Sequence, residues 1–299
     1  MRRFISEFGF SNTIGFIGLG NMGIGMAHNL AKTRIVYAYD ASPAWQSQIE
    51  SSNIKPVSQV ADVTANADTI ITMLPNDKIV KSVAQEIFKK QKKMLIDSST
   101  ISPYTSYELA KMAQDTKNIY SDAPVSGSVG EAKLGTLTFM VGADKESYKK
   151  ISPILKEMGK NVFHCGKIGE GQIAKVSSNM ALAIQMISVA EALALGKNMG
   201  MDPAMLSSIM SVSSSKCWSV DTYNPVPGVM PNVPSSKDYD GGFMVELMLK
   251  DLDIAIDASK KSGTDAQLGQ HAQQIYNKLN EHFGKKDFAI VYKELIKSK

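Results

Sequence analysis

The stretch TIGFIGLGNMGIGMAHNL, residues 13–30, decides the fold class of this chain. A run of apolar and β-branched residues ends at a glycine-rich turn, and a helix-like segment follows directly. In the pattern Gly-x-Gly-x-x-Gly the first glycine permits a tight turn, the second lets a pyrophosphate approach backbone N–H groups, and the third allows close packing of helix and strand. The stretch therefore predicts a strand, a helix and, between them, a dinucleotide-binding turn formed by Gly18, Leu19, Gly20, Asn21, Met22 and Gly23.

An aspartate at the end of the next apolar run supports this prediction. Asp40 closes the predicted strand RIVYAYD, and no arginine follows it in Ala41-Ser42-Pro43. A carboxylate at this point accepts hydrogen bonds from the ribose hydroxyls and repels a 2′-phosphate. The pattern favours NAD over NADP. The alternative is a strand–turn–helix unit whose glycines serve the backbone alone.

Composition bounds the class of protein. The chain has 299 residues, which favours about two domains, and 43% hydrophobic with 21% charged residues is typical of a globular protein. The formal charge of +4 is spread along the chain, so neither a nucleic acid nor a membrane surface is expected as a partner. No uninterrupted apolar run approaches the ~20 residues of a membrane span. The two cysteines lack CxxC spacing and the four histidines lack ligand spacing, so we expect no disulfide scaffold and no metal.

The chain changes character near residue 166. Residues 13–166 alternate short apolar runs with helix-like segments, which predicts an α/β domain with a Rossmann-type doubly wound sheet. Residues 167–299 predict an all-α domain that begins with a long interdomain helix over about 169–199, where apolar residues recur every three or four positions. A Pro/Gly-rich loop at 222–242 interrupts this domain and is expected to be functional or mobile.

Four internal motifs make the family assignment specific. They are MLPN at 73–76, IDSSTISP at 96–103, DAPVSGSVGEAKLGTLTFMVG at 122–142 and GQIAKVSSNM at 171–180. With these motifs in order behind the first glycine motif, nearly the whole chain resembles the β-hydroxyacid dehydrogenases. The segments at 217–243 and 248–255 are similar to the branch of that family that acts on 3-hydroxyisobutyrate. The resemblance implies NAD-dependent oxidation of 3-hydroxyisobutyrate to methylmalonate semialdehyde, a step of valine breakdown.

The resemblance also implies catalytic roles. Lys175 falls on the catalytic lysine of the family, and Asn179 follows one turn later on the same helix face, where it would hold the substrate or orient the lysine. As hydride leaves the hydroxyl-bearing carbon, a neutral amine within hydrogen-bond reach can take the hydroxyl proton. Burial and the positive nicotinamide ring would both favour that neutral form. On spacing alone, Lys175 would be a solvent-exposed helix position.

The remaining site residues also come from the resemblance. Ser126, Gly127 and Ser128 match the segment that grips the substrate carboxylate, although an ordinary turn has the same composition. Ser128 stands where the family usually carries a second glycine, so strain is expected if that position needs a positive φ. Phe243 would form an apolar wall for the substrate or simply pack in the core. Four further residues would contact the cofactor: Leu74, Pro75, Thr100 and Lys250.

Two other functions stay open at this stage. One is a glyoxylate or succinic semialdehyde reductase of the same family; those enzymes tend to prefer NADP and carry a basic residue after the second strand. The other is a non-catalytic cofactor-binding module, which loss of the lysine would mark. The expected partner is a small 3-hydroxyacid bound between the domains, and the expected assembly is a homodimer or homotetramer. Residues 1–12 suit either a short presequence or a tail, so a mitochondrial matrix location is expected for a eukaryotic source and a cytoplasmic one otherwise.

Overall fold

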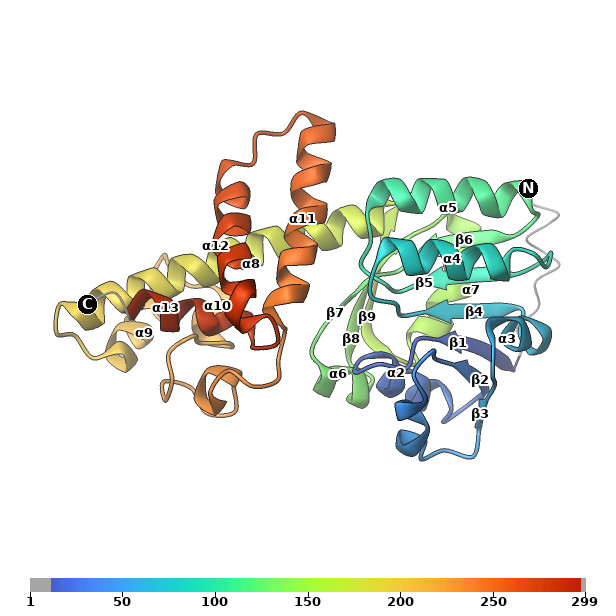
Figure 1. Cartoon of the computed structure of the whole chain (residues 1–299), viewed down its shortest axis with the longest axis horizontal. Coiled ribbons are helices and arrows are strands. Elements are labelled where there is room, and N and C mark those ends of the chain that lie inside the picture. Colours follow the sequence, from blue (N-terminus) through green and yellow to red (C-terminus); the bar gives the residue numbers. More distant parts are fainter. Residues whose placement is uncertain (1–11, 297–299) are drawn as a thin grey trace. The chain divides into compact units, whose positions relative to one another are not determined.

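The computed structural model describes residues 12–296, which form two compact units (Figure 1). The division falls within one long helix, after Lys175. Unit 1 is the part of the chain up to Lys175, and unit 2 is the part that follows it.

Unit 1 is built on a mixed sheet with nine strands among the described residues. Its first six strands run parallel in the order β3-β2-β1-β4-β5-β6, the doubly wound order of dinucleotide-binding domains. β8 pairs antiparallel with β6 and β7, and β9 pairs parallel with β8. The strands are β1 Thr13–Ile17, β2 Ile35–Tyr39, β3 Ile54–Pro56, β4 Thr69–Thr72, β5 Met94–Asp97, β6 Ile119–Asp122, β7 Val125–Ser126, β8 Leu137–Gly142 and β9 Gly159–Gly166.

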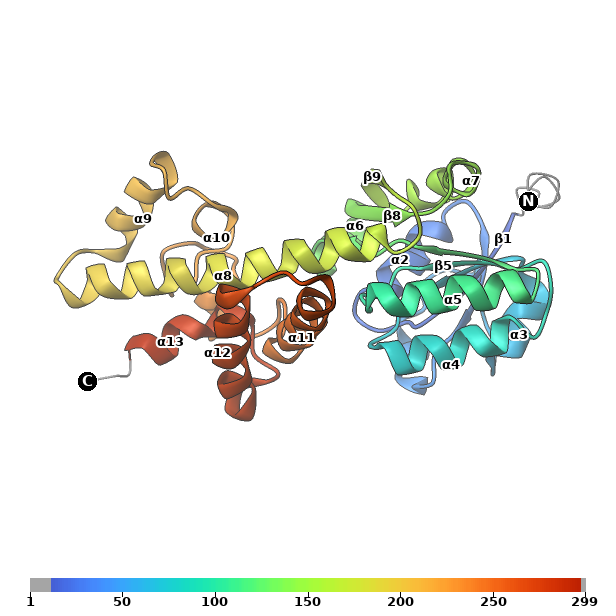
Figure 2. The same ribbon diagram turned by 90° about the horizontal axis from the view of Figure 1, so that it is seen from above.

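Alternation along the central strands fills two cores. Phe16, Ile71 and Ile96 face one cluster, and their neighbours Ile17 and Ile70 face the other. All four residues of β4 and of β5 are buried, as expected for parallel strands covered on both faces. Figure 2 shows α4 and α5 on one side of the sheet and α6 and α7 on the other.

The helices of unit 1 begin at signals that are visible in the sequence. Asn76 caps α4 by accepting the N–H of Ile79, and Ser102 with Pro103 opens α5. The helices of this unit are α2 Gly23–Leu30, α3 Val60–Asn66, α4 Asp77–Ile87, α5 Pro103–Asp115, α6 Val129–Leu134 and α7 Lys145–Leu155, with the 3-10 turn η1 at Pro43–Gln48.

The regular secondary structure in the described residues of unit 2 is helical, apart from an isolated bridge between Met244 and Asp287. The core of unit 2 combines apolar residues of α8 with four buried aromatic side chains, those of Tyr239, Tyr276, Phe288 and Tyr292. The elements are α8 Glu170–Asn198, which begins in unit 1, then α9 Pro203–Val212, α10 Trp218–Asp221, η2 Pro234–Lys237, α11 Val245–Ser262, α12 Gln267–Phe283, η3 Phe288–Ile290 and α13 Val291–Ile296.

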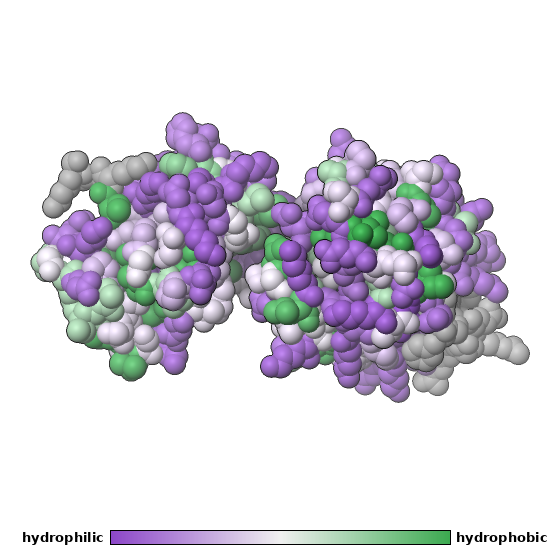
Figure 3. Space-filling model, turned by 90° about the horizontal axis from the view of Figure 1, so that it is seen from below, coloured by the Kyte–Doolittle hydropathy of each residue, from purple (hydrophilic) through white to green (hydrophobic). Residues whose placement is uncertain are grey.

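The long helix α8 is apolar enough to pass, by length and composition, for a membrane-spanning helix, although the sequence has no uninterrupted apolar run of that length. The core helix of a soluble protein passes the same test, and 44% of the apolar window is buried inside the structure. On the face drawn in Figure 3, hydrophilic residues are spread over both units and strongly hydrophobic ones form small separate patches. This helix is therefore weak support for a membrane partner.

The predicted fold class is confirmed: a Rossmann-type sheet, a long helix and an all-α C-terminal part follow one another. The segment 159–166 was not expected as a strand, because its glycines and polar residues give no apolar run. It forms β9 because the exposed edge of β8 offers hydrogen-bonding partners to it. The predicted loop 222–242 contains the 3-10 turn η2.

Candidate active site

The turn between β1 and α2 is shaped by two glycines that no other residue could replace without movement. Gly18 has a φ of 97°, its N–H donates to the carbonyl of Tyr39 at 2.9 Å, and a Cβ there would overlap the carbonyl oxygen of Met73. A Cβ on Gly23 would overlap the carbonyl oxygen of Gly18. Both glycines are thus required to bring the start of α2 against the strand ends.

The rest of the turn is open to a ligand. A Cβ built on Gly20 would have no neighbour within 4 Å. Within residues 12–296, the N–H groups of Asn21 and Met22 meet no hydrogen-bond acceptor, and no side chain caps the start of α2. Unpaired N–H groups at a helix N-terminus form an anion site, so these residues fit the pyrophosphate of a dinucleotide.

Asp40 lies directly after β2 and contacts this turn. Its Oδ2 accepts the N–H of Leu19 at 2.7 Å, and its Oδ1 accepts the N–H of Ser42, also at 2.7 Å. The carboxylate is therefore held from both sides, with lone pairs left for ribose hydroxyls. The sequence predicted only the ribose contact, and the bond to Leu19 shows that Asp40 also fixes the glycine turn.

The residues expected near the nicotinamide follow β4 and β5 at the carboxyl edge of the sheet. The N–H of Leu74 donates to Ser99 Oγ at 2.8 Å, which joins the turn that holds Pro75 to the turn that holds Thr100. Asp97 lies beneath them, fully buried, and accepts bonds from Thr72 Oγ1 and the Ser99 N–H. Burial raises the pKa of Asp97 to about 6. The structure thus brings these cofactor candidates together on adjoining turns.

The candidate carboxylate-binding segment, Ser126 to Ser128, begins at the last residue of β7 and is exposed to solvent. The positive φ in this turn belongs to Gly127, at 141°, while Ser128 has an extended backbone with a φ of −88°. The strain considered for Ser128 is therefore absent.

Ser128 instead forms a capping box with Glu131. Its hydroxyl accepts the N–H of Glu131 at 3.3 Å, and its own N–H donates to Glu131 Oε2 at 2.7 Å. Glu131 was not among the expected site residues, although the Ser-x-x-Glu pattern is a known capping signal. The Ser128 N–H is already donated, but its hydroxyl accepts the N–H of Glu131 and keeps its own hydrogen, so the Ser128 hydroxyl can still donate to an anion beside Ser126 and Gly127.

Lys175 lies in the second turn of α8 and is 9% exposed, so it is not a solvated helix position. Gln172, in the turn before it, is fully buried: its Oε1 accepts the N–H of Ile101 at 3.1 Å and its Nε2 donates to the Ser99 carbonyl at 2.7 Å. The sequence did not single out Gln172. Its contacts tie the start of α8 to the turn that holds Thr100.

In unit 2, Asp251 joins two of the predicted residues. Its Oδ2 accepts from Asn179 Nδ2 at 2.5 Å, and its Oδ1 lies 3.0 Å from Lys250 Nζ. Asn179 is buried, while the Lys250 side chain is 26% exposed. A buried carboxylate between an amide and an ammonium fixes both side chains.

Phe243 is half-buried and packs on the core of unit 2. Its ring meets Phe288 edge-on at a centroid distance of 5.9 Å, and its N–H donates to Asp287 Oδ2 at 2.8 Å. Asp287 also accepts from the hydroxyl of Tyr223 and from the N–H of Ala289, and burial raises its pKa to about 6. Asp287 thus ties the end of the Pro/Gly-rich loop to the segment before α13.

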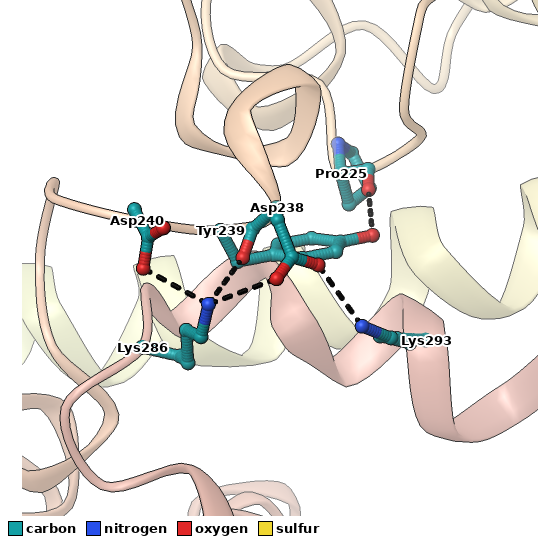
Figure 4. Close-up of polar contacts among 6 residues, drawn as sticks. All are labelled: Pro225, Asp238, Tyr239, Asp240, Lys286 and Lys293. Atoms are coloured by element: carbon teal, nitrogen blue, oxygen red, sulfur yellow. Dashed lines mark hydrogen bonds and ion pairs between the residues drawn. The ribbon is translucent and has the colours of Figure 1, made fainter.

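A cluster of charges also fixes the Pro/Gly-rich loop (Figure 4). Lys286 Nζ contacts the carbonyl oxygen and the Oδ2 of Asp238, at 2.9 and 3.0 Å, and Lys293 Nζ lies 3.0 Å from Asp238 Oδ1. Beside them the hydroxyl of Tyr239 donates to the carbonyl of Pro225 at 2.9 Å. These contacts link the loop that leads to Phe243 to Lys286 and to Lys293 on α13.

Within residues 12–296, no three His, Cys, Asp or Glu side chains group in a way that could hold a metal ion. The site candidates of unit 1 and those of unit 2 are each supported by buried polar contacts.

Two family models match the chain. Residues 13–166 match the NAD binding domain of 6-phosphogluconate dehydrogenase, and residues 169–295 match a domain described as NAD-binding of NADP-dependent 3-hydroxyisobutyrate dehydrogenase.

Relatives that match most of the chain are named 3-hydroxyisobutyrate dehydrogenase. The mitochondrial 3-hydroxyisobutyrate dehydrogenase of Rattus norvegicus is 48% identical over 94% of this chain and 86% of its own. The Homo sapiens protein of that name is 47% identical over the same shares. Among solved structures, the 3-hydroxyisobutyrate dehydrogenase of Mycobacterium tuberculosis with L-serine superposes with a TM-score of 0.90 at 37% identity, covering 95% of this chain and 98% of that one.

Proposed function

Because the chain belongs to the 3-hydroxyisobutyrate dehydrogenase family of NAD-dependent oxidoreductases, we propose that it oxidises 3-hydroxyisobutyrate to methylmalonate semialdehyde with Lys175 as the acid/base group. The observation that carries the proposal is the 48% identity over 94% of the chain to a relative of that name. The buried position of Lys175 supports its role, since a family match alone would not distinguish it from a surface lysine.

We assign the cofactor contacts to unit 1 and to Lys250. The turn Gly18–Gly23 would hold the pyrophosphate, Asp40 the adenosine ribose, and the turns around Leu74–Pro75 and Thr100 the nicotinamide side. When bound, NAD accepts the hydride from the hydroxyl-bearing carbon. The open N–H groups at the start of α2 and the fixed carboxylate of Asp40 make the turn Gly18–Gly23 suited to binding NAD.

The substrate contacts follow from the charges of a 3-hydroxy acid. Ser126, Gly127 and the hydroxyl of Ser128 would bind its carboxylate, and the capping box of Ser128 supports the turn. Neutral Lys175 would take the hydroxyl proton as the carbonyl forms, and return it in the reverse direction. Asn179, held by Asp251, would orient the substrate or the lysine.

The remaining contacts are placed in unit 2. Phe243 would face the methyl group of the substrate, and its anchoring by Asp287 gives it a fixed position. Lys250 would reach the cofactor, with Asp251 limiting its motion. We propose an NAD-binding domain at 13–166 and a helical domain at 167–299.

Assembly and location are also proposals. Met205, Ile209 and Val212 form an exposed apolar stripe along α9, and Leu195 and Met199 are exposed at the end of α8. Such a surface suits a homodimer or homotetramer. Relatives from rat, human and Dictyostelium discoideum are named as mitochondrial, so we propose a mitochondrial matrix location and a role in valine breakdown for a eukaryotic source; the candidate presequence lies almost wholly outside the described residues.

Steady-state kinetics with purified protein test the reaction. NAD and NADP are each assayed with 3-hydroxyisobutyrate and, in the reducing direction, with glyoxylate and succinic semialdehyde. Turnover of 3-hydroxyisobutyrate with NAD supports the proposal. A strong preference for NADP with the aldehydes would assign the chain to the reductases of the family.

A lysine variant tests the mechanism. Lys175→Ala should lower kcat by about a hundredfold or more while NADH still binds, because only the proton transfer is removed. Lys197→Ala, at an exposed position of the same helix, is the matched control. If Lys175→Ala keeps its activity, the proton passes through another group.

A further inference from the structure

The start of α8 is held by a carboxylate that the proposed chemistry does not use. Asp122, the last residue of β6, is fully buried. Its Oδ1 accepts the N–H of Gly169 at 2.6 Å, and its Oδ2 accepts the N–H of Gln172 at 2.9 Å. A negative charge at a helix N-terminus also interacts favourably with the helix dipole. We call Asp122 and the two residues that donate to it the α8 anchor.

The α8 anchor has a second attachment through the Gln172 side chain. This fully buried amide bridges the N–H of Ile101 and the carbonyl of Ser99. The first turn of α8 is thereby fixed both to the end of β6 and to the turn after β5. Four hydrogen bonds, all between groups far apart in the sequence, determine where this turn lies.

The helix start is also as close to the sheet as the backbone allows. A Cβ on Gly171 would overlap the carbonyl oxygen of Met140 and the carboxylate of Asp122. Gly169 has a φ of 88°, a conformation that favours glycine. The Asp122 carboxylate therefore packs directly against the backbone of the first turn of α8.

This arrangement connects the two halves of the proposed chemistry in unit 1. Lys175 follows Gln172 by one turn of α8, and Ser126 follows Asp122 by four residues along the DAPVS segment. A shift of the first helical turn relative to β6 would change the separation of the base from the carboxylate grip. Misplacement by about 1 Å can lower a rate on the order of a hundredfold.

We propose that Asp122 is a positioning residue, whose ionised carboxylate fixes the first turn of α8 and through it holds Lys175 in register with the substrate grip at Ser126. This inference rests on the proposed role of Lys175. Asp122 itself touches neither substrate nor cofactor in this scheme.

The strength of the α8 anchor should depend on pH, because Asp122 accepts both hydrogen bonds best when it is ionised. Burial raises the pKa of Asp122 to about 7, against the opposing effect of its two N–H donors. A protonated carboxyl group has one oxygen that carries hydrogen, so it can no longer accept both N–H bonds equally. The anchor is therefore complete above about pH 7 and weakened below it.

The titratable groups around Asp122 come from each element packed on it. Burial raises the pKa values of the tyrosines and the cysteine among them, so these groups stay neutral near pH 7. Asp97 has a pKa of about 6 and is present in every variant compared below. The groups are Asp97 on β5, Tyr120 on β6, Tyr107 on α5, Cys165 on β9, and Glu170 and Lys175 on α8.

The test is the ratio of kcat in the unmodified protein to kcat in Asp122→Asn, measured from about pH 6.5 to 8.5 with saturating NAD and 3-hydroxyisobutyrate. The amide keeps the size of the side chain but can accept only one of the two bonds with its single oxygen. We expect a ratio of about ten to a hundred at the highest pH, falling several-fold toward the lowest, with the Kd for NADH changed by less than about twofold. Lys175 is present in both proteins.

Asn118→Ala is the matched control for stability. Asn118 is buried at the opposite end of β6, and its side chain makes hydrogen bonds to Lys93 and Lys90. It should lower Tm while kcat changes by less than about twofold at every pH. A ratio for Asp122→Asn that is near one, or large but independent of pH, overturns the inference.

A second variant covers the case in which Asp122→Asn does not fold. Gln172→Leu keeps the bulk of the side chain and removes its two side-chain hydrogen bonds, so kcat should fall several-fold with NADH binding retained. Unchanged kcat in that variant also overturns the inference. Lys175→Ala distinguishes a failure of the proposed function from a failure of this inference. If Lys175→Ala keeps its activity, the proposed role of the lysine is refuted. If Lys175→Ala loses its activity while Asp122→Asn keeps the kcat of the unmodified protein, only the positioning role of Asp122 is refuted.

Discussion

Replacing Asp40 separates two contributions that one carboxylate makes to cofactor binding. Asp40 fixes the glycine turn through the N–H of Leu19, and its charge opposes a 2′-phosphate. Asp40→Ala removes both contributions. Asp40→Asn removes the charge and can keep the bond to Leu19 through its remaining oxygen.

The structure sets the size of each contribution. The Leu19 bond is 2.7 Å long and partly buried, and a hydrogen bond to a charged group contributes about 2 kcal/mol. The bond to Ser42 is exposed, so water replaces it at little cost. Repulsion of a doubly charged phosphate at ~5 Å adds about 2 kcal/mol at the dielectric constant of water, and more in a less polar environment. Each 1.4 kcal/mol is about a tenfold change in affinity, so each contribution corresponds to roughly thirtyfold.

The two variants should therefore differ. Asp40→Ala should weaken NAD binding about thirtyfold or more and leave NADP binding nearly unchanged, because the two effects offset each other for NADP. Asp40→Asn should weaken NAD less and strengthen NADP by about thirtyfold.

The assay is fluorescence titration with NADH and NADPH at low ionic strength, where charge effects are largest. Asp62→Asn, which changes a half-buried carboxylate at the start of α3 in the same unit, is the control. If the ratio of the two affinities is the same in both Asp40 variants as in the unmodified protein, the ribose does not bind at Asp40 and the reasoning is refuted.

Three further changes test other parts of the structure. Glu131→Ala frees the Ser128 N–H and removes a negative charge beside the carboxylate-binding segment, so KM for the hydroxy acid should fall a few-fold. Loss of the capping box should lower the free energy of unfolding by about 1 kcal/mol. A raised KM in steady-state kinetics would contradict this prediction. Asp287 has a folded-state pKa of about 6, above its ordinary value, so its ionisation weakens unit 2 as pH rises from about 4 to 6, by on the order of 3 kcal/mol. Asp287→Asn should remove that decline, and urea unfolding of unit 2 at several pH values would reveal it; an unaltered pH slope would assign the decline to other groups. Gly171→Ala would overlap the carbonyl of Met140 and should destabilise unit 1 by ~1–3 kcal/mol, measured as a lower Tm, and an unchanged Tm would mean that the helix start can move.

Local patterns in the sequence were sufficient for much of the fold. The apolar run before Gly18 predicts β1, and Asp202 followed by Pro203 marks the start of α9 by cap and first-turn preference. These signals act between residues a few positions apart, so they need no knowledge of packing. The segment 159–166 has no such signal and forms a strand only because β8 lies beside it.

The sequence also identified candidate site residues where a motif carried them. It indicated Gly18, Asp40 and Lys175, and the structure gives each a physical setting: a required positive φ, a carboxylate held by two N–H groups and a buried helix position. A one-residue departure at Ser128 suggested strain. The structure shows a capping box instead, because the positive φ lies at Gly127.

Sequence by itself determined the class of fold, the family and the residue types of the candidate site. Only the tertiary structure decided how those residues are held. Asp122 meets Gly169 across 47 positions of the chain, and Gln172 meets Ser99 across 73. No local preference specifies such contacts, because their partners become neighbours only when the strands and α8 pack together and exclude water from the groups between them.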